Sequence, residues 1–337
     1  MIKNYRNVVV ANPRRILRLR VRNIIRAFSG RVGVSARNLT TSEKFNINEQ
    51  TVFPALSSIK LAILIELFYQ EKEGKLQLDE KITITRSDQR GGTGILRDLT
   101  PPIHLSLRDL AVLMITVSDN TSTWLVSSKV GRSNVNDRMR LLGLKAMDLR
   151  SDLGPAIFER MDHTDIDAYA VSSPADMTDL IGLIAEGKVV SRRACTQMIE
   201  ILRMCQSVDF LGRYLPINQF ATETKIEPEA KLANKIGSMM HGRTDVGLVE
   251  TESVRYVITV MTDRSLDNSL IMSVHEGTEV IGRISKAVYD AWALSPLSQN
   301  KKQGGLLCDD IGVLEQWRLD ILHRKRILQE EREFHDH

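Results

Sequence analysis

Three short motifs in this sequence combine residue types that can carry out acyl transfer. They are Ser57-Ser58-Ile59-Lys60, Ser118-Asp119-Asn120 and Lys235-Ile236-Gly237-Ser238. In the first motif Lys60 follows Ser57 by three residues, which places both side chains on one face of a helix. A serine hydroxyl is a poor nucleophile until a base accepts its proton, and a desolvated lysine with a lowered pKa can be that base. The first motif therefore predicts Ser57 as a nucleophile and Lys60 as its base.

The second and third motifs supply the groups that such a pair needs around it. Ser118 can pass a proton between a lysine and a leaving nitrogen, and the Asn120 amide can hold both Lys60 and a substrate carbonyl. Lys235, on a predicted strand, would present a cation to a substrate carboxylate, and Gly237 would let the substrate approach the strand closely. Each motif alone is common, because Ser-x-x-Lys is typical of a capped helix start and Ser-Asp-Asn of a helix-capping turn. The interpretation as an acyl-transfer site therefore rests on the occurrence of all three motifs in this order.

The elements that must position these motifs follow from hydrophobic periodicity and turn residues. Arginines alternate with apolar residues over 14–28, which predicts an amphipathic helix, and strands are predicted at 31–39 and 44–48. From Ser57 onward the pattern is helical, with Ser106 as the N-cap of a later helix. Strands return at 231–238, 246–252 and 254–264, and a closing helix covers roughly 270–292. One sheet completed from both ends of the chain, with helices inserted between, predicts a groove between two lobes.

The predicted fold class is α/β, of the α+β type, with an antiparallel sheet flanked by helices and an all-helical lobe inserted into it. The predicted segments are a basic amphipathic helix in 1–29, a main domain in 30–293 and a tail with a charged helix in 294–337. Within the main domain, residues 30–52 and 220–293 form the sheet lobe and residues 53–219 the helical lobe. The first helix is expected to cover the sheet, and contact with a membrane surface is the alternative.

The order and context of the three motifs resemble the penicillin-recognising serine enzymes, whose signature is S-x-x-K, S-D-N and K-T-G. The flanking segments VFPALSSIKLAIL, LMITVSDNTSTWLV, LLGLKAMDLRS, SSPADMTDLI and RYLP are similar to those of class A β-lactamases. The resemblance covers roughly residues 30–293. It implies a class A β-lactamase-like fold and an acyl-enzyme mechanism.

The resemblance also implies a role for each motif residue. Ser57 would attack a lactam or amide carbonyl, with Lys60 as the base for acylation. Ser118 and Lys235 would carry the proton toward the leaving nitrogen. The backbone N–H groups of Ser57 and Ser238 would form the oxyanion hole. Lys235, together with Ser238, would hold the substrate carboxylate.

Two departures from the family pattern bear on activity. Ile236 replaces the hydroxyl residue of the third motif, so a charge-assisted hydrogen bond to a penicillin carboxylate is missing, at a cost of about 1.5–3 kcal/mol. The loop after the LGL segment lacks the glutamate that activates the deacylating water. The register from Leu149 puts Leu153 at that position, and the nearest substitutes are Glu159, Asp152 and Asp162. Glu159 is the candidate base, and without such a base acylation outruns deacylation.

These observations predict a serine hydrolase that acts on a β-lactam, amide or ester, with β-lactamase-type hydrolysis as the leading activity. The first alternative is a penicillin-binding protein or D,D-peptidase, or a slow-turnover acyl-enzyme sensor. The second is a scaffold protein that keeps the fold and uses its basic first helix or its tail. The expected partner is a small-molecule substrate, and the sequence does not fix the oligomeric state.

Composition limits the other classes of function. The 337 residues carry a formal net charge of +4, which is too mild to indicate nucleic-acid binding. No run of 18 apolar residues occurs, and arginines fill the region where a signal peptide needs an apolar core, so the predicted compartment is the cytoplasm. Neither a metal-ligand constellation nor a phosphate-binding loop is evident, so no metal and no cofactor is expected. His104 and His163 are interpreted as surface residues, and Asp245 as a partner in a salt bridge.

The three cysteines show no metal-ligand spacing. Cys195 and Cys205 are expected on one helix, about 15 Å apart, which is too far for a disulfide. This spacing fits a reducing compartment.

Overall fold

The computed structural model describes residues 13–151, 169–269 and 271–294, and these form an α+β fold around one five-stranded antiparallel sheet. The strand order is β2-β1-β10-β9-β8. The strands are β1 (Arg31–Asn38), β2 (Lys44–Ile47), β8 (Lys231–Met239), β9 (Gly242–Glu250) and β10 (Arg255–Asp263). The prediction of one sheet completed from both ends of the chain is confirmed, because β1 pairs with β10 along its whole length.

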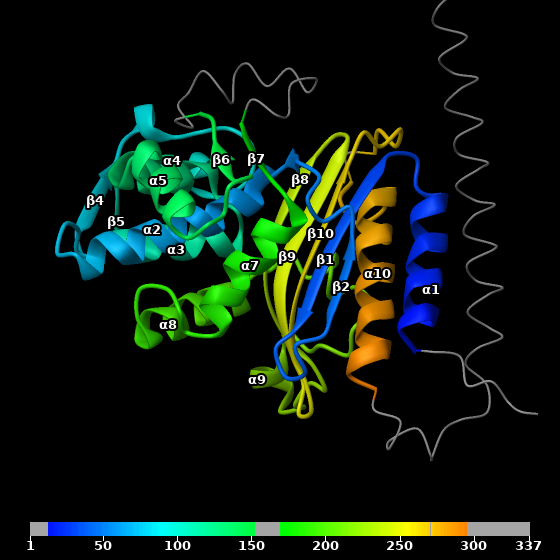
Figure 1. The fold of residues 1–337 in the computed structure, drawn as a ribbon. Helices are drawn as coiled ribbons and strands as arrows, with labels where there is room; N and C mark the ends of the chain where they lie inside the picture. Colours follow the sequence, from blue (N-terminus) through cyan, green and yellow to red (C-terminus); the bar gives the residue numbers. More distant parts are fainter. Residues whose placement is uncertain (1–12, 152–168, 270, 295–337) are drawn as a thin grey trace, which may run out of the picture.

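One face of the sheet is covered by α10 (Glu276–Trp292), on which α1 (Pro13–Ala27) packs (Figure 1). The apolar stripe of α1 consists of Leu17, Val21, Ile24 and Ala27, all buried. Of these, Leu17, Val21 and Ile24 join a hydrophobic cluster with Val34, Tyr256 and Ile281. The amphipathic first helix therefore covers the sheet lobe, as expected. No helix in the described part of the chain is long and apolar enough to cross a membrane.

The other face of the sheet contacts α7 (Pro174–Ala185) and the helical lobe (Figure 1). Ser173 caps α7 by accepting a hydrogen bond from the Asp176 amide, and Pro174 starts the helix with a preset φ. The lobe contains α2 (Lys60–Lys72), α3 (Leu107–Thr116), α4 (Asn120–Val130), α5 (Arg132–Leu141) and α8 (Arg192–Arg203). Most of α2 is buried on every side, which explains its nearly uniform apolar sequence.

Several short elements connect these helices, and sequence periodicity missed most of them. They are β3 (Phe53–Pro54), the 3-10 turn η1 (Leu56–Ile59), β4 (Lys81–Ile84), η2 (Arg86–Asp88), η3 (Leu96–Asp98), β5 (Ile103–Ser106), β6 (Asp148–Leu149), β7 (Ala170–Ser172) and α9 (Ala221–Thr224). The two-stranded pair β4–β5 and the three-stranded sheet β3-β7-β6 lie outside the main sheet. Segments this short carry too few residues for a period to show.

Two sequence expectations are corrected. The α-helix of the first motif begins at Lys60 and not at Ser57, because a 3-10 turn precedes it. Cys195 lies in α8, but Cys205 lies beyond the end of that helix, so the two cysteines do not share a helix. Both thiols are free and buried.

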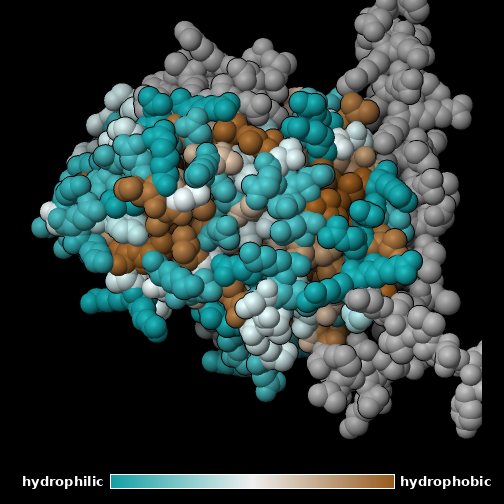
Figure 2. All heavy atoms as spheres, viewed as in Figure 1, coloured by the Kyte–Doolittle hydropathy of each residue, from teal (hydrophilic) through white to brown (hydrophobic). Residues whose placement is uncertain are grey.

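The face of the molecule in Figure 2 is mostly hydrophilic, with apolar areas separated by hydrophilic side chains. That appearance is ordinary for a globular protein whose apolar residues fill two internal clusters.

Candidate active site

Ser57 lies in the 3-10 turn η1, between β3 and the first turn of α2. The preceding residue, Leu56, has a φ of +52°, in the left-handed region that a leucine rarely adopts, so the chain turns sharply just before Ser57. The next residue, Ser58, is buried, and its hydroxyl donates to the Ala55 carbonyl at 2.5 Å. Ser57 itself is half-buried. The turn thus leaves Ser57 partly accessible to solvent, while its neighbour is anchored in the interior.

Lys60 is fully buried, and its side-chain nitrogen connects the first motif to the second. It donates to the Ser118 carbonyl at 2.7 Å, to the Ser118 hydroxyl at 2.9 Å and to Asn120 Oδ1 at 3.0 Å. Burial, and secondarily the charge of Lys235, hold the pKa of Lys60 well below its usual range, whereas Asp119 opposes that shift. A lysine in this state gives up its proton readily and can act as a base.

The predicted contact between the Lys60 amine and the Ser57 hydroxyl is not among the hydrogen bonds of the described residues. The amine instead donates to Ser118 and Asn120. Catalytic hydrogen bonds are often long in a site without substrate, so the role of Lys60 as the base for Ser57 stays a prediction.

Ser118 lies between α3 and α4 with a φ of +55°, a conformation that costs a non-glycine residue about 1 kcal/mol or more. The next residue, Asp119, holds this turn in place. Its carboxylate caps α4 by accepting from the Ser122 amide at 2.8 Å, and it also accepts from the Ile95 amide at 2.7 Å and the Leu96 amide at 3.0 Å. Asp119 therefore fixes both the second motif and the neighbouring loop.

That loop, Gly91-Gly92-Thr93-Gly94, surrounds the second motif and was not singled out by sequence reasoning. The Thr93 hydroxyl donates to the Ser118 carbonyl at 2.7 Å, so it shares this acceptor with Lys60. The Asn120 amide nitrogen donates to the Gly91 carbonyl at 2.9 Å. A Cβ at Gly92 would lie 2.4 Å from that nitrogen, so only glycine fits. The cluster of glycines was the signal that could have identified this loop.

Lys235, on β8, is the second buried lysine of the site. Its side-chain nitrogen donates to the Ile236 carbonyl at 2.8 Å. Burial lowers the pKa of Lys235 to about 8, while Cys205 and Asp245 act in the opposite direction. The charge of Lys235 also lowers the pKa of Lys60, which indicates that the third motif lies near the first two.

Gly237 brings β8 against the turn that carries Ser57. A Cβ on Gly237 would lie 2.6 Å from the Leu56 Cβ and 2.9 Å from the Ser57 amide nitrogen. The sequence predicted that a missing side chain here admits the substrate. The structure shows that the turn containing Ser57 packs against this position, so any larger residue at 237 must displace Ser57.

The remaining residues of the third motif differ in their surroundings. Ile236 is buried in the cluster between the sheet and α10. Ser238 is half-buried and pairs with Arg243 on β9. Because β8 is an edge strand, its outer side has no partner strand in the described sheet.

Several sequence predictions fall on other parts of the chain. Glu159, Asp152, Asp162, Leu153 and His163 lie outside the described residues, so the choice of a deacylation base stays a prediction. His104 is exposed on β5 and lies 3.1 Å from the Thr83 hydroxyl. Within the described residues, no group of three or more His, Cys, Asp or Glu side chains could hold a metal ion.

The expectation of a salt bridge at Asp245 is wrong. Its carboxylate is fully buried and accepts from the Asn234 side-chain amide and the Leu211 backbone amide. No lysine or arginine in the described part of the chain lies within ion-pair distance of it. Sequence spacing could not reveal this, because Leu211 approaches β9 from a distant segment.

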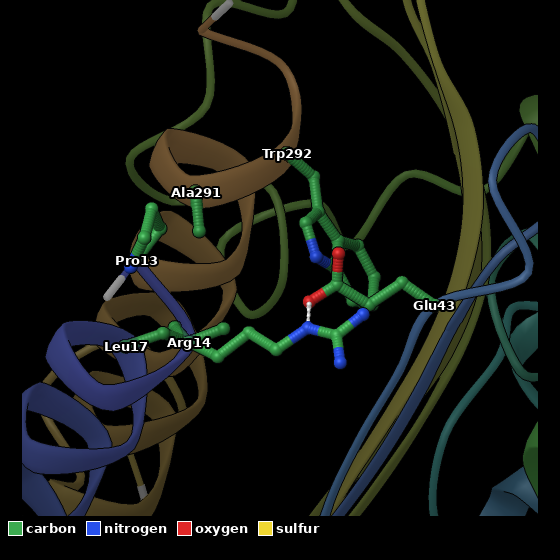
Figure 3. Close-up of a pocket in the computed structure, with 6 residues that line it drawn as sticks. All are labelled: Pro13, Arg14, Leu17, Glu43, Ala291 and Trp292. Carbon is green, nitrogen blue, oxygen red and sulfur yellow. Dashed lines mark hydrogen bonds and ion pairs between the residues drawn. The ribbon is translucent and has the colours of Figure 1, made fainter.

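A pocket with a cavity volume of about 210 Å³ lies on the opposite side of the sheet, between α1, α10 and the β1–β2 turn (Figure 3). The residues lining it are Pro13, Arg14, Leu17, Glu43, Ala291 and Trp292. Arg14 Nε donates to Glu43 Oε1 across the pocket at 2.9 Å. None of the three motifs contributes to its walls, so it is separate from the candidate active site.

The chain is similar to known proteins in both sequence and fold. A family model described as "Beta-lactamase enzyme family" matches residues 16–292. Beta-lactamase PSE-4 of Pseudomonas aeruginosa is 27% identical over 120 residues, which cover 35% of this chain and 41% of that protein. The chain thus aligns with less than half the length of that relative.

Solved structures with the same fold cover most of this chain. A beta-lactamase from Sphaerobacter thermophilus is 27% identical, with a TM-score of 0.72, over 83% of this chain and 98% of that one. PBP-A is 25% identical, with a TM-score of 0.70, over 83% of this chain and 97% of that one. A PBP-A variant in which glutamate replaces a leucine, solved as an acyl-enzyme complex with penicillin G, matches equally well.

Proposed function

Since this chain belongs to the beta-lactamase enzyme family, we propose that it hydrolyses β-lactams through an acyl-enzyme formed on Ser57. The observation that carries the proposal is the buried amine of Lys60, three residues after Ser57, which forms hydrogen bonds with Ser118 and Asn120. Burying a lysine away from water lowers the stability of the fold, and groups with such perturbed pKa values concentrate at functional sites.

In the acylation step, the Ser57 oxygen attacks the lactam carbonyl carbon and its proton passes to the Lys60 amine. The backbone N–H groups of Ser57 and Ser238 stabilise the oxyanion. The ring C–N bond then breaks, and the Ser118 hydroxyl gives its proton to the leaving nitrogen. Ser118 recovers a proton from Lys60 along their 2.9 Å hydrogen bond. Lys235 binds the substrate carboxylate throughout.

Deacylation needs a base that activates a water molecule toward the ester carbonyl. Glu159 is the candidate, in the segment where relatives of this family carry their catalytic glutamate. Hydrolysis returns the proton to Ser57 and releases the opened product. The rate of this step decides whether the protein is a hydrolase or a long-lived acyl-enzyme.

A second candidate function is therefore a penicillin-binding protein whose acyl-enzyme persists. The observation that favours it is Leu153, which the sequence register places where the family's glutamate is expected. PBP-A is similar to this chain, and a leucine-to-glutamate variant of PBP-A was solved with penicillin G bound covalently.

Intact-mass spectrometry during reaction with a chromogenic cephalosporin tests both functions. Transient labelling of Ser57 with continuous colour release supports the hydrolase, and a persistent adduct supports the penicillin-binding protein. Ser57→Ala must abolish the adduct without changing the thermal melt, and an unchanged adduct in that variant would contradict both functions.

Two variants identify the deacylation base. Glu159→Gln should prolong the adduct if Glu159 activates water. Leu153→Glu should shorten it if the register is correct. If neither variant changes the adduct lifetime, the base lies elsewhere in the chain.

A further inference from the structure

The outer face of α1 carries a row of exposed arginines, which we call the arginine stripe. Its members follow one another at intervals of three or four residues, which places them on one side of the helix: Arg15, Arg18, Arg22 and Arg26. No carboxylate of the described residues forms an ion pair with any of them. Four cations within about 17 Å of helix, without counter-charges, create a local positive potential that attracts an anionic partner.

The two other arginines of α1 have a different role, because each pairs with a carboxylate of the sheet lobe. Arg14 Nε donates to Glu43 Oε1 at 2.9 Å, and Arg20 Nη1 donates to Asp290 Oδ2 at 2.8 Å. These pairs fasten α1 to the β1–β2 turn and to α10. They also engage the carboxylates beside the helix, so the charge of the arginine stripe is left without compensation.

The burial of the apolar side of α1 fixes the direction in which the arginine stripe faces. Leu17, Val21 and Ile24 are buried in the cluster with the sheet and α10, so this side of the helix cannot insert into a bilayer. Leu19 is 52% exposed and lies beside the stripe, four residues after Arg15. An exposed leucine among arginines suits the headgroup region of a membrane, where arginine stems lie along apolar surface and their charged ends remain in water.

The arginine stripe and the candidate active site lie on opposite faces of the main sheet. Side chains alternate along β8, and Ile236 belongs to the cluster beneath α10, so Lys235 faces the helical lobe. Val246, opposite Lys235 on β9, belongs to the cluster of that lobe. Figure 1 shows α1 and α2 on opposite sides of the sheet. A surface that binds the stripe would therefore not cover the site.

An anionic lipid surface fits the arginine stripe better than a nucleic acid does. Clusters of about four to eight basic residues on a helix are typical of binding to anionic phospholipids, because each residue is attracted separately by the surface potential. Binding to a nucleic acid is typical of domains with a large excess of positive charge, whereas the 337 residues of this chain carry a formal net charge of +4. A single row of arginines on one helix face also suits a planar partner.

We propose that the arginine stripe of α1 binds the protein to an anionic phospholipid surface. The bound protein lies with α1 against the lipid headgroups and with the candidate active site on the side away from them. This inference does not depend on the proposed function, because the stripe shares no residue with the three motifs.

The test is sedimentation of the full chain with lipid vesicles of two compositions. One composition is phosphatidylcholine alone, and the other is a mixture of phosphatidylcholine and phosphatidylserine. Wild-type protein should bind the mixed vesicles at least ~10-fold more tightly than the uncharged ones. This preference should disappear at about 1 M salt, where the Debye length falls to about 3 Å.

Replacing the whole arginine stripe by glutamine tests whether the position of these charges matters. Glutamine has a helix propensity close to that of arginine. Binding to the mixed vesicles should weaken at least ~10²-fold, because each basic residue near an anionic surface strengthens binding about fivefold. A matched control lowers the net charge equally by glutamine substitutions at four exposed residues of the helical lobe, namely Lys81, Arg108, Arg192 and Arg193. The control should bind as tightly as wild type.

Equal binding of wild-type protein to both kinds of vesicle would overturn the inference, as would equal losses in the stripe variant and the control. Binding of wild type to a random-sequence DNA duplex but not to the mixed vesicles would also overturn it and would assign the stripe to nucleic acid. Should the stripe variant fail to fold, the double variant Arg18→Gln/Arg22→Gln replaces it, with an expected loss of roughly 25-fold. Wild-type affinity in that double variant would contradict the inference.

Discussion

The side-chain nitrogen of Lys60 lies 2.9 Å from the hydroxyl oxygen of Ser118 and 2.7 Å from the carbonyl oxygen of the same residue. One buried amine therefore contacts both the proposed proton carrier of the second motif and the backbone that positions it. The left-handed φ of Ser118 and the burial of the Lys60 amine each lower the stability of the fold. The hydrogen bonds between Lys60 and Ser118 stabilise both features.

Lys60→Met should abolish acylation and raise thermal stability. Loss of the base should reduce the acylation rate at least ~10²-fold. The pKa of Lys60 is lowered in the folded state, so below its unfolded value of about 10.4 the unfolded chain binds this proton more tightly and burial destabilises the fold. The gain in melting temperature should therefore be large at pH 7 and shrink at pH 10. Equal or lower melting of the variant at pH 7 would contradict this reading.

Ser118→Gly and Ser118→Ala should lose activity alike but differ in stability. Both remove the hydroxyl that serves the leaving nitrogen, so acylation should fall by a factor of ~10²–10⁴. Only glycine relieves the φ of +55°, so Ser118→Gly should be more stable than Ser118→Ala by about 1 kcal/mol. Chemical denaturation measures the difference. Two variants of equal stability would show that the backbone at Ser118 is not strained.

Gly237→Ala should lower acylation because the added Cβ would lie 2.9 Å from the Ser57 amide nitrogen. The turn of Ser57 must move, and the oxyanion hole moves with it. Gly74→Ala is the control, since its Cβ would meet nothing within 4 Å and only its φ of +72° is unfavourable. The control should lose about 1 kcal/mol of stability and keep full activity. Acylation by Gly237→Ala at the wild-type rate would rule out the close approach.

The pH profile of kcat/KM for a carboxylate-bearing β-lactam should be bell-shaped. Activity should fall on the acid side as Lys60 gains its proton, and on the alkaline side as Lys235 loses its proton near pH 8. Lys235→Arg keeps its charge and should extend the alkaline limb. A methyl ester of the same β-lactam should lack that limb. An alkaline limb that persists with the ester would assign it to another group.

Sequence reasoning identified the groups that local pattern encodes and missed those that tertiary contacts create. Lys60, Ser118 and Asn120 stand in recognisable motifs, and the structure brings them within hydrogen-bond distance. Thr93 joins them only because Asp119 draws its loop onto the second motif. No spacing rule links residues 93 and 118, so that contact could not be predicted.

The same limit explains the wrong expectation about Asp245 and the contact that was missed at Gly237. A charged residue on a strand usually finds a charged partner, but Asp245 meets the backbone amide of Leu211 instead. Gly237 was interpreted from its motif only as a position where substrate approaches the strand, which stays a prediction, and its contact with the turn at Leu56 was missed. In both cases the partner approaches from a segment far away in the sequence.

The pairing of Arg31 with Asp263 joins residues 232 positions apart. During synthesis the nucleophile turn and the whole helical lobe leave the ribosome long before Lys235 is translated. The first hairpin of the nascent chain stays exposed until the last strands of the sheet have been translated. Pairing between strands so far apart in the sequence slows folding. The cell thus holds no reactive serine site until Lys235 and the strands around it have been translated.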